Sequence, residues 1–177
     1  YINEQYDPAM SWKDAEYCIK RWGGPFALKG VMSVEDAKRA IDIGASAIML
    51  SNHGGRQLDG SRAPFDQLEK IVDAVGGKIE IIVDGGIRRG THVLKALSLG
   101  ATACSFGKGF LFALSAGGQK GVEIMLQRMR EELRRDMILL GKKNIGDLSK
   151  ENIYKRNSSD FCDEIISSTI TTSKCSI

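Results

Sequence analysis

The sequence predicts an α/β fold in which repeated βα units form a sheet of parallel strands. A shift of 56 residues superposes Gly30-Val31 on Gly86-Ile87, and both copies read as strand, glycine-containing loop, helix and strand. Four short apolar runs are typical of strands that are buried on both faces. Glycines and polar residues follow each run, at the strand ends where a (β/α)8 barrel carries its functional side chains. Four strands cannot close such a barrel, so a second half barrel is expected before Tyr1 or in another chain.

Capping signals, glycine stops and hydrophobic periodicity predict the individual elements in order. Ser11 with Asp14 matches a capping box, and Ser33 with Asp36 matches a second one, so a helix should begin at each serine. A long amphipathic helix should follow Gly117-Gly118 and bury one of its faces. The strands are expected at 26–29, 47–51, 79–83 and 103–106; the helices at 12–22, 34–43, 65–75, 91–99, 110–116, 119–140 and 145–152; and the buried face of the long helix at Val122, Leu126, Met129, Leu133 and Met137.

Composition excludes several classes of protein. A net charge of +3 is mild and the basic residues are scattered, which argues against nucleic acid as a partner. Four cysteines and two histidines lack a metal-ligand spacing, so no metal site is expected. The absence of a signal peptide and of a membrane-length apolar run predicts a soluble protein of a reducing compartment. The chain begins with Tyr1 rather than Met, which suggests a fragment with a domain over 1–154 and a disordered tail over 155–177.

One strand end carries a base beside a cation. His53 and Arg56 follow the apolar strand 47–51, and Gly54 and Gly55 lie between them. A neutral imidazole can accept a proton near neutral pH, and a guanidinium can bind a carboxylate through two hydrogen bonds. The spacing alone leaves two interpretations open, proton abstraction from a small acid and a polar loop with a surface histidine.

The last two strand ends predict an anion site. Glycines should expose backbone N–H groups there, each loop adds a cation, and a helix begins directly afterwards. In barrels, phosphate groups commonly bind at the loops after the seventh and eighth strands. These features favour a phosphate site over a plain turn, whereas Arg89 is expected to be a surface cation. The expected members are Gly85, Gly86, Arg88, Gly107, Lys108 and Gly109.

Taken together, these motifs resemble the family of FMN-dependent 2-hydroxy acid dehydrogenases and oxidases. The resemblance covers about residues 5–150 and rests on Lys29-Gly30, SNHGGRQ at 51–57, DGGIRRG at 84–90 and Gly107-Lys108. The segment DPAMSWKD near the start is most similar to the bacterial L-lactate dehydrogenase branch. The resemblance implies that the chain is the C-terminal half, strands five to eight, of a (β/α)8 TIM barrel.

The resemblance also implies a role for each site residue. His53 would be the base that takes the substrate hydroxyl proton while hydride passes from the α-carbon to flavin N5, and Arg56 would bind the substrate carboxylate. Lys29 would lie near flavin N1 and O2, where negative charge develops. Ser51 would hydrogen-bond the isoalloxazine, and Asp84 the ribityl hydroxyls. The ribityl and phosphate end would be held by Gly85, Gly86, Ile87, Arg88, Gly107 and Lys108.

The implied activity is the oxidation of an (S)-2-hydroxy acid to the 2-oxo acid, with FMN as cofactor and L-lactate as the expected substrate. Lys108 stands where the family usually has arginine, which keeps the charge but loses the planar fork. Gly55 is typical of the dehydrogenases rather than the oxidases. The aspartate that orients the base would come from strands one to four, so the isolated chain is expected to be inactive.

Two other functions stay open: an inactive half-barrel remnant or module, and another FMN- or phosphate-binding barrel such as an isomerase. The pair His53 and Arg56, with no cysteine in a strand-end loop, counts against the second. The expected partners are a small 2-hydroxy acid, the missing N-terminal half barrel and further copies in a homo-oligomer. The expected location is the cytoplasm, with peripheral attachment to the inner membrane left open.

Overall fold

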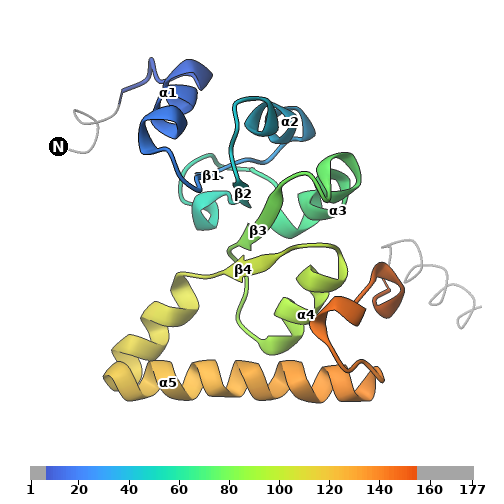
Figure 1. The fold of residues 1–177 in the computed structure, drawn as a ribbon. Coiled ribbons are helices and arrows are strands. Elements are labelled where there is room, and N and C mark those ends of the chain that lie inside the picture. Colours follow the sequence, from blue (N-terminus) through green and yellow to red (C-terminus); the bar gives the residue numbers. More distant parts are fainter. Residues whose placement is uncertain (1–6, 155–177) are drawn as a thin grey trace, which may run out of the picture.

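The structure is a computed structural model, and it describes residues 7–154 (Figure 1). Four strands form one parallel sheet, in which each strand pairs with the next one along the chain. The predicted α/β class and the parallel repeat are therefore confirmed. The predicted tail over 155–177 lies outside the described residues. The strands are β1 (Ala27–Lys29), β2 (Ala47–Leu50), β3 (Glu80–Asp84) and β4 (Ala103–Ser105).

Helices connect the strands, and their starts follow the predicted capping chemistry. The Ser11 backbone N–H donates to Asp14 Oδ2 at 2.7 Å, which completes the first capping box. The Ser33 hydroxyl accepts a hydrogen bond from the Asp36 N–H at 3.0 Å at the start of the second helix. The helices are α1 (Trp12–Trp22), α2 (Val34–Asp42), α3 (Pro64–Val75), α4 (Gly90–Ser98) and α5 (Lys108–Leu139), with 3-10 turns η2 (His53–Gly55), η3 (Ile145–Asp147) and η4 (Lys150–Asn152).

Helix α5 contains both of the helices predicted around the glycine pair. Gly117 and Gly118 leave helical geometry, with φ of +55° at Gly118, so the chain changes direction there (Figure 1). The prediction for Leu126 is wrong, because this side chain is 50% exposed, whereas Met129 is buried. The helix expected over 145–152 is instead the two turns η3 and η4.

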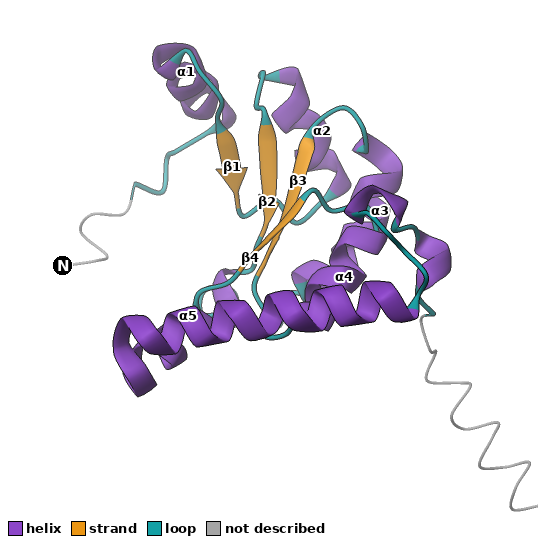
Figure 2. Ribbon diagram, turned by 60° about the horizontal axis from the view of Figure 1, so that its bottom comes forward, coloured by secondary structure: helices purple, strands orange, loops and turns teal. Residues whose placement is uncertain are grey.

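The core lies between one face of the sheet and helices α2, α3 and α4 (Figure 2). Ile48 and Leu50 of β2 are fully buried on this face, beside Ile81 and Val83 of β3. Each such side chain contributes roughly 1.5–3 kcal/mol relative to its exposed state. The alternate positions, such as Met49, are only partly buried within the described chain. The expectation that both faces are covered is therefore met on one face only, because an inward-facing barrel residue needs opposite strands to pack against.

Candidate functional site

A cavity of about 680 Å³ lies at the carboxyl ends of the strands. This volume falls within the usual range of roughly 300–1,000 Å³ for small-molecule sites. The structure brings all predicted site residues but one to the cavity wall; the exception is Ser51, which is buried and does not line the cavity. The predicted residues that line it are Lys29, His53, Arg56, Asp84, Gly85, Gly86, Ile87, Arg88, Gly107, Lys108 and Gly109.

The turn η2 places His53 and Arg56 at the cavity. His53 has φ of +57°, the left-handed region that non-glycine residues rarely adopt. Its N–H donates to the Ser51 hydroxyl at 3.1 Å, and Asn52 Oδ1 accepts from the Gly55 N–H at 3.2 Å. Within the described chain, the His53 ring and the Arg56 guanidinium make no hydrogen bond or ion pair. Both groups are therefore available to a ligand.

Asp84 is the buried charge at the base of the site, with 8% of its surface exposed. It accepts a hydrogen bond from the Ser51 hydroxyl at 2.7 Å and pairs with Lys29 Nζ at 3.3 Å. Burial by itself raises the pKa of the Asp84 carboxyl, but hydrogen bonds from Ser51 and Ser105 and the Lys29 charge together hold that pKa below its ordinary value. Asp84 is therefore an anion at neutral pH, and it joins the ends of β1, β2 and β3.

Lys108 connects the two ends of the cavity. Its ammonium group donates to the Gly54 carbonyl oxygen at 3.2 Å, so the start of α5 is tied to the turn that carries His53. An ammonium has three donors, so this contact leaves further donors for an anion. The lysine that replaces the expected arginine thus supports the η2 turn as well as adding positive charge.

The glycine loop after β3 differs in one respect from the predicted anion site. The sequence predicts an exposed Gly85 N–H that could bind an anion. In the structure this N–H donates to the Ser105 carbonyl at 3.1 Å, so it extends the sheet and is not free. Gly85 and Gly86 have φ of +100° and +73°, which glycine adopts without strain. A Cβ atom built at either position would meet no protein atom within 4 Å, so their open sides leave room for a ligand.

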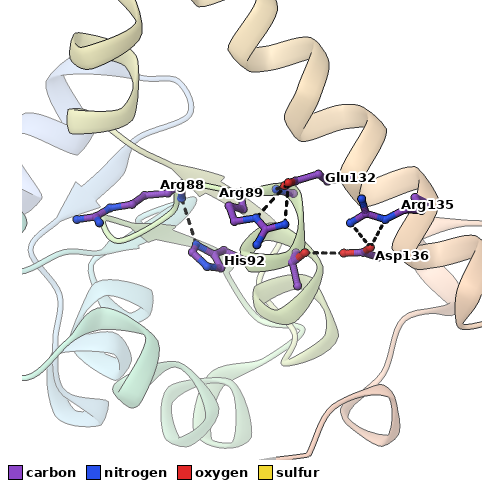
Figure 3. A network of polar contacts seen from close by, with 8 residues as sticks. Arg88, Arg89, His92, Glu132, Arg135 and Asp136 are labelled. Carbon is purple, nitrogen blue, oxygen red and sulfur yellow. Dashed lines mark hydrogen bonds and ion pairs between the residues drawn. The ribbon is translucent and has the colours of Figure 1, made fainter.

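Arg88 and Arg89 point in different directions (Figure 3). Arg88 lines the cavity, while Arg89 binds Glu132 of α5, with Arg89 Nη2 2.9 Å from Glu132 Oε1. The expectation that Arg89 is a surface cation is met, because its side chain is 58% exposed, and the structure adds its ion pair with Glu132.

Sequence reasoning missed several residues that line the cavity. His92 and Lys95 lie on one face of α4, and His92 Nδ1 accepts the Arg88 N–H at 3.2 Å. Their spacing of three residues directly after the anion loop is the signal that could have identified them. The other missed residues are Asn52, Ala63, Pro64, Phe65, Phe106 and Leu111.

These residues fit a flavin mononucleotide. Arg88 and Lys108 can bind a phosphate dianion, and the Asp84 carboxylate can accept hydrogen bonds from ribityl hydroxyls. The open glycine sides allow the ligand to lie against the backbone. Among residues 7–154, no group of three or more His, Cys, Asp or Glu side chains is placed to hold a metal ion. No helix in the same range is long and apolar enough to cross a membrane.

Comparisons with known proteins agree with this description. The sequence profile of the family described as FMN-dependent dehydrogenase matches residues 1–155. The chain is 44% identical over 156 residues to an L-lactate dehydrogenase of Vibrio cholerae serotype O1 (strain M66-2), covering 88% of this chain and 41% of the relative. It is 45% identical over 151 residues to an L-lactate dehydrogenase of Haemophilus influenzae (strain PittEE), covering 85% and 40%. The chain thus spans about two-fifths of the length of these curated relatives.

Solved structures of similar sequence share the fold. A crystal structure of mandelate oxidase with benzoyl-formic acid aligns with a TM-score of 0.76 at 46% identity, covering 78% of this chain and 42% of that one. A mandelate oxidase variant with a monooxide FMN adduct aligns with the same TM-score and identity, covering 78% and 44%. The partial coverage of these proteins agrees with the interpretation of the four strands as part of a TIM barrel.

Proposed function

This chain belongs to the family of FMN-dependent dehydrogenases, and from that premise we propose that it oxidises an (S)-2-hydroxy acid to the 2-oxo acid as part of a completed barrel. L-lactate is the first candidate substrate, because the curated relatives at 44–45% identity are named L-lactate dehydrogenases. One observation carries the proposal: the His53 ring and the Arg56 guanidinium have no protein partner in the described chain and lie on the wall of the cavity that Arg88 and Lys108 also line.

In this proposal the η2 turn carries the residues that bind the substrate and remove its proton. Arg56 binds the substrate carboxylate and thereby places the hydroxyl-bearing α-carbon at His53. A neutral ring nitrogen of His53 accepts the hydroxyl proton. FMN, when bound, supplies the acceptor for the hydride that leaves the α-carbon. The Ser51 hydroxyl accepts the His53 N–H and so supports the positive φ of the backbone that carries the base.

The other site residues hold the cofactor in this proposal. Arg88 and Lys108 bind the phosphate, and Gly86 and Gly107 supply backbone donors, a role that Gly85 cannot fill because its N–H bonds to β4. Lys29 provides positive charge where negative charge develops on the flavin. Its pairing with Asp84 at 3.3 Å keeps the ammonium at the strand ends. Ser51, Asp84 and Ile87 complete the wall and its support.

A complementary half barrel would complete the site. In the described chain β1 and β4 are the edges of the sheet, and the second face of the sheet is only partly covered. His53 has no acidic partner among residues 7–154, so nothing there stabilises its protonated form. We therefore expect the chain by itself to be catalytically inactive.

The alternative of another FMN barrel would require a catalytic cysteine. The described structure does not support that role for Cys104. Cys104 lies within β4, and burial raises the pKa of its thiol to about 11. A thiol with a raised pKa holds little of the reactive thiolate at neutral pH. This observation favours base catalysis by His53.

The proposal is tested in a chimeric barrel, in which residues 1–155 replace the matching segment of the Vibrio cholerae relative. The purified chimera should carry FMN, and its flavin absorbance should bleach on addition of L-lactate. His53→Gln should lower kcat by at least about 10²-fold, the usual contribution of a general base, without loss of flavin. Turnover that survives this substitution unchanged would exclude His53 as the base.

Arg56→Lys serves as the test of carboxylate binding in the same chimera. It should raise KM for L-lactate, because an ammonium cannot make the two-pronged contact of a guanidinium. Arg62→Lys is the matched control. It is the same substitution in the same loop, but Arg62 does not line the cavity. Equal kinetic effects of the two substitutions would contradict the role of Arg56.

A further inference from the structure

The turn between β3 and α4 is held from outside by two acidic residues of α5 (Figure 3). Glu132 accepts from the Arg89 guanidinium through Oε1 at 2.9 and 3.1 Å, and from the Gly90 N–H through Oε2 at 2.8 Å. One turn later, Asp136 Oδ2 accepts from the Thr91 hydroxyl at 2.6 Å. Both carboxylates of α5 therefore accept hydrogen bonds from the first residues of α4.

The close packing of α4 on α5 makes these contacts possible. A Cβ atom built on Gly90 would overlap the Met129 carbonyl oxygen and the Leu133 nitrogen, so only glycine lets the two backbones approach this closely. The Arg89 and Gly90 hydrogen bonds lower the pKa of Glu132, which keeps its side chain ionised at neutral pH. The contact to Arg89 is thus a charge-assisted one.

The backbone then determines where Arg88 points. Arg89 is extended, with φ of −143° and ψ of +157°. In an extended segment, consecutive side chains lie on opposite sides. Because Glu132 draws Arg89 toward α5, the neighbouring Arg88 is turned to the cavity side, which it lines.

We propose that Glu132 is a positioning residue for phosphate binding. Because it pairs with Arg89 and the Gly90 N–H, Arg88 rather than Arg89 is the arginine that binds a phosphomonoester. The inference rests on the proposed function, because the phosphomonoester is that of the flavin. It adds that α5, which follows the barrel strands, sets the affinity for the phosphate group. Glu132 itself lies outside the cavity wall.

The test compares two flavins that differ only in the phosphate. Dissociation constants for FMN and for riboflavin are measured by flavin fluorescence with the chimeric barrel, because a complementary half barrel is expected to complete the site. Glu132→Gln, which keeps an acceptor but loses the charge, should weaken FMN binding about tenfold, the effect of losing one hydrogen bond to a charged group. Riboflavin binding should stay unchanged. A purely structural role would weaken both flavins together, or neither.

Glu131→Gln is the matched control. Glu131 precedes Glu132 on α5, is exposed, and bonds to Gln127 of the same helix. This variant should bind both flavins like the unaltered chimera, and Arg89→Met should reproduce the FMN-specific loss. Circular dichroism checks that each variant is folded. If Glu132→Gln does not fold, the FMN and riboflavin affinities of Arg89→Met test the positioning role.

The outcomes separate this inference from the function on which it rests. An unchanged ratio of FMN to riboflavin affinity in Glu132→Gln and Arg89→Met, with FMN still bound, would overturn the positioning role alone. An unaltered chimera that binds neither flavin would contradict the cofactor site itself, and the inference would fall with it.

Discussion

Asp84 shows how one residue can connect several strand ends. Its carboxylate binds Ser51 of the segment after β2 and Lys29 of β1, while its own position is the last residue of β3. Ser51 in turn accepts the N–H of His53, so the proposed base is two hydrogen bonds away from a buried anion. The state of Asp84 is therefore expected to affect both folding and the site.

This arrangement makes stability depend on pH in the acid range. The pKa of Asp84 is lower in the folded chain than its ordinary value, so the stabilisation is fully present above the ordinary pKa and is lost as the pH falls through the folded pKa. Ser51→Ala removes one hydrogen bond to the charged carboxylate, which is worth about 1.5–3 kcal/mol. The acid unfolding midpoint, followed by circular dichroism, should therefore move to higher pH.

Ser61→Ala is the control for this prediction, because the Ser61 side chain does not contact Asp84. An acid midpoint that moves equally in both variants would show that Ser51 does not stabilise the ionised form of Asp84.

At the scale of elements, the contact between α4 and α5 gives the glycine loop its fixed shape. Gly90 begins α4 against the α5 backbone, so a methyl group at this position must separate the two helices. Gly90→Ala should lower the free energy of unfolding by about 1–3 kcal/mol, as overpacked sites do. Urea unfolding measures this change.

Gly146→Ala provides the comparison for Gly90→Ala. A Cβ at Gly146 would meet no atom within 4 Å, and its φ is not in the left-handed region. The unfolding midpoint of this control should stay close to that of the unaltered chain. A Gly90→Ala variant as stable as the control would contradict the close approach of the helices.

At the scale of the whole molecule, the described chain exposes apolar surface where a barrel would continue. The first part of α5, directly after the edge strand β4, exposes 41% of Phe110, 54% of Leu111 and 68% of Phe112. Such a cluster marks an interaction site. We expect it to be covered by the complementary half barrel of the proposed enzyme.

The full chain alone should therefore bind the apolar dye ANS, and the chimeric barrel should bind much less. Phe112→Ser should reduce dye binding by the chain, because it removes an exposed aromatic ring from the cluster. Leu139→Ser, which changes an exposed residue at the other end of α5, is the matched control. Equal dye fluorescence from the chain and the chimera would argue against the missing cover.

Local signals in the sequence determined the order of the strands and helices, the capping boxes and the positions of the glycine turns. Those features depend on residues a few positions apart, so chain neighbours decide them. The motif around His53 and Arg56 was readable for the same reason. The family resemblance identified the four strands as half of a barrel, which the solved structures support.

Only the tertiary structure decided which of two neighbouring residues of the same type lines the cavity and which makes a structural contact. Arg88 and Arg89 are alike in sequence, but Glu132, more than forty residues later, binds one of them and leaves the other to the cavity. Gly85 and Gly86 are likewise distinguished by the pairing of β3 with β4, which uses the Gly85 N–H. The physical reason is that these contacts depend on packing between segments far apart in the chain, which no local pattern of residue types records.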